Sequence, residues 1–156
     1  MAFKNIFVLF CFVILFGCAS QPVKYDTPSG KPEITINASI DDIKSLLISR
    51  LQQNNWILVS DTKYMTSFSS SCLDQYDAFR CSVGQALIGN SYSTTPQLEM
   101  TLSWTEYDNS VRVMVTSYSM STQMAFGQVN RSNMLSGSKM HNDLTDWLRS
   151  AKDYLE

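Results

Sequence analysis

Histidine is nearly absent from this sequence, because His141 is the only one among 156 residues. A catalytic set built on an imidazole base therefore depends on this one side chain, and a metal site made of histidine and cysteine has too few ligands. Basic and acidic residues nearly balance, at 12 against 14, and neither forms a block. A nucleic-acid-binding face needs clustered basic residues, so we expect no nucleic-acid partner. The six glycines are scattered singly, which argues against a glycine-rich phosphate loop. We expect neither a metal nor another cofactor.

Long apolar runs are also missing, apart from one near the start. Residues 6–16 form an apolar stretch of about 11 residues, whereas a membrane-spanning helix needs about 20. The polar Ser20 follows closely, so the run cannot be extended. Lys4 precedes the run and Gly17-Cys18 follows it. A charged start, an apolar middle and a small residue at the cut are the layout of a secretory signal.

The residues Leu15-Phe16-Gly17-Cys18 resemble the lipobox of bacterial lipoproteins. In that family the cysteine thiol receives a diacylglyceryl group, a dedicated signal peptidase cuts before it, and the new amino terminus is acylated. The resemblance implies that residues 1–17 are a signal peptide and that Cys18 is the lipidated first residue of the mature chain. Two or more acyl chains hold a protein stably on a bilayer, whereas one is marginal. In the Gram-negative family an Asp directly after the lipidated Cys favours the inner membrane. Ala19 stands there instead, so the resemblance implies anchoring in the outer membrane, with the domain facing the periplasm.

Cleavage before Cys18 would leave residues 18–156, the size of one ordinary domain. It would remove only Lys4 among the charged residues, so the net charge would change from −2 to −3. Residues 18–32 are rich in Pro, Ser and Gly, which predicts a flexible tether between lipid and domain. No repeat or second boundary follows, and residues 33–156 are expected to form a single domain.

Two cysteines remain once Cys11, in the signal, and Cys18 are set aside. Cys72 and Cys81 would lie in an oxidising compartment, where such a pair is expected to form a disulfide that closes a short loop. A metal site is the alternative, but it needs two further ligands. A redox-active pair is another alternative, which the spacing disfavours because it is not Cys-x-x-Cys.

Residue periodicity predicts secondary structure of both kinds. Apolar residues at helical spacing predict a helix capped by Ser39 and ended by Asn54-Asn55, and another over residues 140–155. Strict alternation predicts two strands, around 98–104 and 111–115, joined by a turn at Asp108-Asn109. We further expect short strands at 34–36, 56–59 (buried), 64–68 and 86–92, a disulfide-closed loop at 69–85, and no regular pattern at 119–133.

The two alternating strands have one apolar and one polar face, which is typical of a sheet covered on one side only. Two amphipathic helices would supply the cover. The expected fold is therefore α+β, a two-layer sandwich in which two helices cover one face of an antiparallel sheet of about five or six strands. This element order and size resemble the small helix-on-sheet modules of accessory lipoproteins of outer-membrane assembly machines.

Catalytic motifs are weak in this sequence. His141 lies one residue off the apolar stripe of the last helix, where a surface or rim position is expected. Ser136-Gly-Ser-Lys139 and Ser60-Asp-Thr-Lys63 match the Ser-x-x-Lys pattern of penicillin-interacting enzymes, but the companion Lys-Thr-Gly and Ser-Asp-Asn motifs are missing. Glu99 and Glu106 are candidates for paired glycosidase carboxylates, although both occupy polar strand or turn positions. We expect no catalytic residues.

Two groups of residues are candidates for binding a partner. The first belongs to the disulfide-closed segment, because Tyr, Phe and Arg are frequent interface anchors and a disulfide pre-orders the backbone; it comprises Leu73, Tyr76, Phe79 and Arg80. Packing of Leu73 and Phe79 beneath the loop is the alternative. The second group has flexible methionine and aromatic side chains that could adapt to a partner, although packing in the core is the commoner role of such residues. It comprises Tyr118, Met120, Met124 and Phe126.

These observations predict a non-enzymatic lipoprotein of the outer membrane that binds another envelope protein in an accessory or assembly role. An immunity or inhibitor lipoprotein that blocks a toxin or a wall-degrading enzyme is an alternative of the same binding class. A small wall-active hydrolase is the alternative of a different class, and only the expected location supports it.

Overall fold

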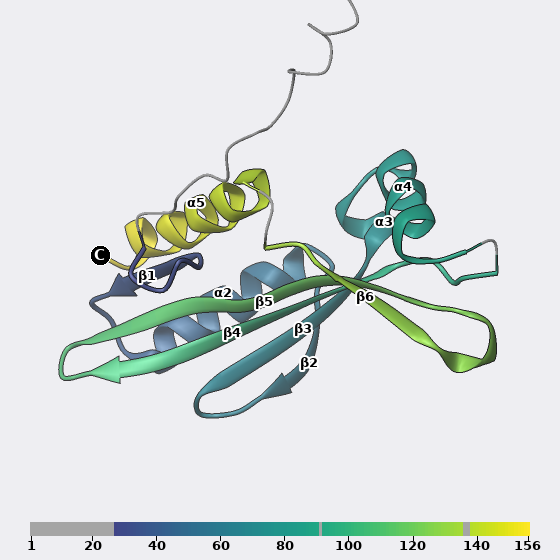
Figure 1. The fold of residues 1–156 in the computed structure, drawn as a ribbon. Coiled ribbons are helices and arrows are strands. Elements are labelled where there is room, and N and C mark those ends of the chain that lie inside the picture. Colours follow the sequence, from purple (N-terminus) through teal and green to yellow (C-terminus); the bar gives the residue numbers. More distant parts are fainter. Residues whose placement is uncertain (1–26, 91, 136–137) are drawn as a thin grey trace, which may run out of the picture.

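The structure, a computed structural model, describes residues 27–90, 92–135 and 138–156. Over these residues the chain forms one six-stranded antiparallel sheet with helices on one side (Figure 1). The strands are β1 (Glu33–Ile36), β2 (Ile57–Asp61), β3 (Met65–Ser71), β4 (Gln97–Tyr107), β5 (Ser110–Gln123) and β6 (Val129–Asn133). The helices are α2 (Ile40–Gln53), α3 (Cys72–Gln75), α4 (Ala78–Ile88) and α5 (Ser138–Leu155), and a 3₁₀ turn spans Ala125–Gly127. The expected α+β class, sheet and helical cover are confirmed.

Strand β5 organises the sheet, whose order is β1-β5-β4-β3-β2. It pairs with β4 along its length, with β1 at residues 111–114, and with β6 at residues 119–123. The first half of β5 therefore lies between β1 and β4, and its second half lies between β4 and β6.

The β4–β5 hairpin forms as the alternation predicts, with a turn at Asp108-Asn109. Leu102 lies opposite Val115, but Thr101 lies opposite Ser117, so β5 carries one extra residue at this point. Such a bulge changes which residues share a face. Tyr118, three residues after Val115, consequently returns to the buried face, and Met120 follows it there.

Helices α2 and α5 cover the buried face of the sheet (Figure 1). The Ser39 hydroxyl caps α2 by accepting a hydrogen bond from the Asp42 amide at 3.1 Å. Asn55 follows the helix at φ 62°, a left-handed conformation that asparagine tolerates. Each helix buries one apolar stripe against the sheet, Ile43, Leu47 and Leu51 from α2 and Leu144, Leu148 and Ala151 from α5.

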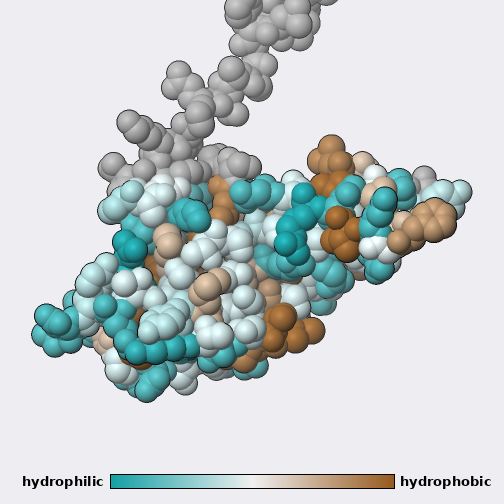
Figure 2. All heavy atoms as spheres, turned by 60° about the horizontal axis from the view of Figure 1, so that its bottom comes forward, coloured by the Kyte–Doolittle hydropathy of each residue, from teal (hydrophilic) through white to brown (hydrophobic). Residues whose placement is uncertain are grey.

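The other face of the sheet is rich in hydroxyl groups. Ser67 and Thr101 are hydrogen-bonded to each other across β3 and β4, with 3.2 Å between their oxygens. Figure 2, turned toward this side, shows a largely hydrophilic surface with apolar side chains in two places. One is the end of the molecule that carries α3 and α4, and the other is the lower edge near β2, whose Ile57 and Val59 are exposed. In the described part of the chain, the helices lie on the opposite face of the sheet, as the sequence predicts.

Several local expectations are wrong. Residues 69–85 and 86–92 do not form a loop and a strand, because α3 and α4 occupy most of them. The 56–59 run is not a buried strand, since β2 is the outermost strand and its Ile57 and Val59 are exposed. Tyr64 precedes β3 and is exposed rather than sharing the inward face of Thr66 and Phe68. The unpatterned 119–133 segment contains the end of β5 and all of β6.

The last part of the expected tether lies against the sheet. Pro32 is buried, and its carbonyl accepts a hydrogen bond from the Val115 amide at 2.9 Å. Lys31 Nζ donates to the Thr116 carbonyl at 3.0 Å. Lys31 and Pro32 thus belong to the packed body of the domain, whereas residues 28–30 are exposed. The expected signal peptide and Cys18 lie outside the described residues.

A chain of hydrogen bonds that runs from the core to the surface ties α2 to the sheet. Trp104 Nε1 donates to Thr66 Oγ1 at 2.9 Å, and the Thr66 hydroxyl donates to Asp61 Oδ1 at 2.6 Å. Lys44 Nζ of α2 donates to the same carboxylate oxygen at 2.7 Å. Partial burial alone would raise the pKa of Asp61, but the hydrogen bonds from Lys44 and Thr66 and the Lys44 charge hold this pKa below its usual value. The inward polar position of Thr66 therefore has a structural explanation.

Replacing Thr66 with valine tests this network. Thr66→Val keeps the shape of the side chain but leaves the buried Trp104 N–H without its acceptor, so we expect a loss of about 1–3 kcal/mol in the free energy of unfolding. Urea denaturation of the full chain measures this loss. The matched control is Thr105→Val at an exposed position of β4, with an expected change of less than about 0.5 kcal/mol. Equal effects at the two positions would show that the network does not contribute.

Candidate functional site

Helices α3 and α4 form a small unit held by a disulfide. Cys72 and Cys81 are both buried and joined through their sulfur atoms, as the sequence predicts, with 5.8 Å between their Cα atoms. Ser71 caps α3, and Asp77 caps α4 by accepting a hydrogen bond from the Arg80 amide at 2.9 Å. These two caps explain why helices stand where a loop is expected, because each satisfies an otherwise free backbone amide.

The α3–α4 unit contacts the sheet through a few close contacts. The hydroxyl groups of Tyr76 and Tyr118 are hydrogen-bonded to each other at 3.2 Å, and the Tyr76 hydroxyl also reaches Met140 Sδ of α5 at 3.7 Å. A Cβ added to Gly84 would lie 2.5 Å from Met120 Sδ, so α4 approaches β5 as closely as a glycine permits. Burial and the Tyr76 hydrogen bond raise the pKa of Tyr118 far above its usual range, which keeps this phenol neutral.

Helix α4 presents its apolar stripe to solvent. Phe79, Val83 and Leu87 are four residues apart and therefore share one face of the helix. Their exposed fractions are 78%, 42% and 80%, while Cys81 on the inward side is buried. In a surface helix of a globular domain the apolar stripe normally faces the core. The orientation of α4 is the reverse, and it leaves a row of large apolar side chains uncovered.

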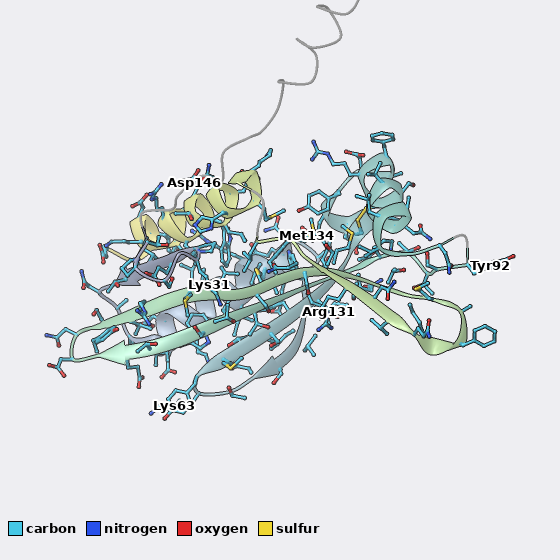
Figure 3. The ribbon with its side chains drawn as sticks, viewed as in Figure 1. Lys31, Lys63, Tyr92, Arg131, Met134 and Asp146 are labelled. Carbon is cyan, nitrogen blue, oxygen red and sulfur yellow. A yellow bond between two sulfur atoms is a disulfide. The ribbon has the colours of Figure 1, made fainter. Side chains whose placement is uncertain are left out.

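A cavity of about 290 Å³ opens beside this stripe, between α4, β5, β6 and the start of α5. Its lining is mostly apolar and includes three methionines; it comprises Tyr76, Arg80, Val83, Gly84, Leu87, Ile88, Met120, Ser132, Met134 and Met140. Figure 3 places Met134 where the end of β6 meets the α3–α4 unit. Methionine side chains are flexible and polarizable, so a cavity lined by them adapts to differently shaped apolar groups. We call the exposed stripe and this cavity together the α4 surface.

The sequence-predicted binding residues lie around the α4 surface. Tyr76 and Arg80 line the cavity, and Phe79 belongs to the stripe. Leu73 is exposed on α3, and Arg80 is paired with Asp77 at 3.4 Å in an exposed ion pair. Leu73 and Phe79 therefore do not pack beneath the segment.

Sequence reasoning missed several members of the α4 surface. The spacing of Phe79, Val83 and Leu87 is visible in the sequence and could have indicated a helix. Met134 and Met140 come from distant parts of the chain, and no local signal connects them to α4. The second predicted group is divided, because Tyr118 and Met120 are core residues whereas Phe126 is fully exposed in the 3₁₀ turn.

The candidate catalytic residues are not brought together. Glu99 and Glu106 are seven residues apart on one strand, so their side chains leave opposite faces of it. Glu99 is paired with Arg131 at 2.6 Å, and Glu106 with Lys63 at 3.6 Å. Ser136 lies outside the described residues.

Residues 27–90, 92–135 and 138–156 contain no group of three or more potential metal-binding side chains. Within the same ranges, every helix is too short or too polar to cross a membrane.

The position of His141 differs from the expected surface or rim site. Only 2% of this residue is exposed, and burial lowers the pKa of its imidazole. The folded protein consequently favours neutral His141 more than the unfolded chain does. Below about pH 6.5, the usual pKa of histidine, the unfolded chain takes up a proton on His141 that the folded protein does not yet bind. The free energy of unfolding therefore decreases as the pH falls from about 6.5 to the lower pKa of the folded protein.

Replacing His141 with glutamine removes this titration. We expect the free energy of unfolding of the wild-type protein to fall between pH 7.5 and pH 5.5, and that of His141→Gln to change less over the same interval. Urea denaturation at several pH values measures both. Identical pH profiles for the two proteins would show that His141 does not carry the dependence.

Comparisons with protein-family models, with curated proteins and with solved structures find no match to this chain. Its function is therefore inferred from its own residues and their geometry.

Proposed function

We propose that this chain is an outer-membrane-anchored lipoprotein whose periplasmic α+β domain binds another envelope protein through the α4 surface and has no catalytic role. The lipobox-like residues Leu15-Phe16-Gly17-Cys18 support the anchor. The disulfide supports an oxidising compartment outside the cytosol. One observation carries the binding role, namely the solvent-facing stripe of Phe79, Val83 and Leu87 beside an apolar cavity.

The free-energy cost of this exposure supports a binding role. Burying a phenylalanine or leucine side chain stabilises a protein by about 1.5–3 kcal/mol. Phe79 and Leu87 contribute little of this to the fold, because each is about four-fifths exposed. Contiguous apolar patches on a soluble domain typically mark sites of interaction with another molecule. A partner that covers the stripe would gain the burial energy that folding leaves unused.

The disulfide adds to the same argument. It joins α3 to the first turn of α4 and so restricts the backbone that carries Phe79 and Arg80. A binding surface that is ordered before the partner arrives loses less conformational entropy on association. The disulfide and the helix caps therefore fix the position of the stripe in the unbound protein, while the flexible methionine side chains of the cavity adjust to the partner.

Loss of the stripe should abolish partner capture without unfolding the domain. We expect the double variant Phe79→Ser, Leu87→Ser, made in the full chain, to lose the envelope protein that chemical cross-linking in cells joins to the wild type. Because both side chains are largely exposed, each substitution should change the free energy of unfolding by less than about 0.5 kcal/mol, and the two together by less than about 1 kcal/mol. Quantitative mass spectrometry of the cross-linked material measures the capture.

The matched control is Tyr107→Ser, which removes an exposed aromatic side chain at the β4–β5 turn, away from α4. This variant should retain the partner. The proposal fails if no envelope protein is reproducibly cross-linked to the wild type, or if the double variant captures the partner as well as Tyr107→Ser does. Intact-mass spectrometry of the purified protein tests the anchor separately, since the proposal requires a chain that begins at an acylated Cys18.

A further inference from the structure

Strand β6 has one free edge in the described part of the chain, because it pairs with β5 alone. The Met134 amide donates to the Tyr118 carbonyl at 2.8 Å, and the Met124 amide donates to the Gln128 carbonyl at 2.7 Å. In an antiparallel pair, hydrogen-bonded and non-hydrogen-bonded positions alternate along each strand. The backbone groups of Asn130 and Ser132 therefore face β5, and those of Val129 and Arg131 point outward.

Side chains of β6 alternate in the same way. Ser132 lies opposite Met120, and both line the cavity on the helix side of the sheet. Arg131 lies on the other side, where its guanidinium pairs with Glu99 at 2.6 Å. Figure 3 shows Arg131 below the sheet and Met134 above it, on the side of α3 and α4. A chain placed along the outer edge of β6 would thus have every second side chain directed toward the helix side.

The cavity and the β6 edge adjoin each other. Val83 and Leu87 of α4 form one wall of the cavity, and Ser132 of β6 belongs to its lining. Asn130 Nδ2 donates to the Ile88 carbonyl at 2.8 Å, which ties the end of α4 to β6. The result is a groove with backbone donors and acceptors along one side and apolar side chains along the other.

We propose that the β6 edge accepts an extended segment of the partner as an added strand, and that alternate apolar side chains of this segment enter the cavity beside α4. This inference rests on the proposed function and specifies the chemistry of the partner. Only an extended peptide supplies backbone groups at the spacing of the outward amides and carbonyls of Val129 and Arg131. Residues two apart in such a strand point to the same side, which matches a cavity on one face of the sheet.

Other occupants fit the groove less well. A helix satisfies its own backbone groups and would leave the β6 edge unpaired, and a lipid chain offers neither donors nor acceptors. A second copy of this chain, paired antiparallel through β6 about Arg131, would direct the polar side chains of its Asn130 and Ser132 toward the helix side, where the cavity is apolar. The observations therefore favour an apolar, extended segment of a different protein.

The outward amide of Arg131 provides a selective test. Arg131→Pro removes this donor and keeps the bonds to β5, because proline is tolerated where the N–H of an edge strand faces outward. Arg131→Ala is the matched control, since it removes the same side chain and the same ion pair with Glu99 but keeps the amide. Ser132→Leu is a second variant, which keeps every backbone donor and fills part of the cavity.

The probe is a displayed library of random dodecapeptides, selected on the detergent-solubilised full chain. We expect enriched peptides with apolar residues at every second position. Their dissociation constants for the wild type and for Arg131→Ala should agree within about twofold. Binding to Arg131→Pro and to Ser132→Leu should be weaker by at least about fivefold. For Arg131→Pro this factor corresponds to the loss of one backbone hydrogen bond. Should Arg131→Pro fail to fold, Ser132→Leu decides the test.

The inference is overturned if no peptide is enriched, if apolar residues recur every three or four positions as in a helix, or if the deciding variant binds as tightly as Arg131→Ala. Dimerisation of the wild type through β6 would also overturn it. Cross-linking in cells separates it from the proposed function. If the envelope partner is lost from Phe79→Ser, Leu87→Ser but retained by Arg131→Pro and Ser132→Leu, the binding role stands and the strand addition does not.

Discussion

Strand β5 carries an apolar face from Val111 to Met120, and the need to cover this whole face shapes the rest of the structure. Helices α2 and α5 extend as far as Tyr118. Leu51 of α2 and Leu144 and Trp147 of α5 line one cavity together with Tyr118. Met120 lies beyond them and is covered by α4 through the close approach at Gly84. Helices α3 and α4, which lie between β3 and β4 in the sequence, thus cover the part of the β5 apolar face that α2 and α5 do not reach.

Helix α4 is short, and its larger apolar side chains point to solvent. The inward side of α4 presents Cys81 and Gly84, so the helix contributes little apolar burial of its own, and the disulfide, two helix caps and the Tyr76–Tyr118 hydrogen bond hold it in place. The stripe of Phe79, Val83 and Leu87 is then available to another molecule. Among the described residues, β6 pairs with β5 alone, and its Ser132 lines the cavity beside α4.

Elements whose apolar residues face the core could be predicted from the sequence. The alternation of β4 and the stripes of α2 and α5 report burial directly, and the Cys72–Cys81 pair follows from the count of cysteines. The spacing of Phe79, Val83 and Leu87 could have indicated helix α4, but it could not show that this stripe faces solvent instead of the core. The second half of β5 was missed because the bulge at Thr116, opposite Thr101 and Leu102, breaks the period of two. Tyr76, Phe79 and Arg80 were predicted as binding residues from their chemistry, whereas the contributions of β6 and α5 depend on tertiary contacts.

The proposed function requires that the α4 surface is exposed in the isolated protein and covered by a partner in the cell envelope. Chemical labelling of a cysteine introduced by Leu87→Cys, with a small maleimide, measures this coverage directly. We expect rapid labelling of the purified full chain and strong protection in envelope preparations, while a cysteine introduced by Tyr107→Cys is labelled equally in both. Equal labelling of Leu87→Cys in the purified protein and in the envelope would show that no partner covers the α4 surface.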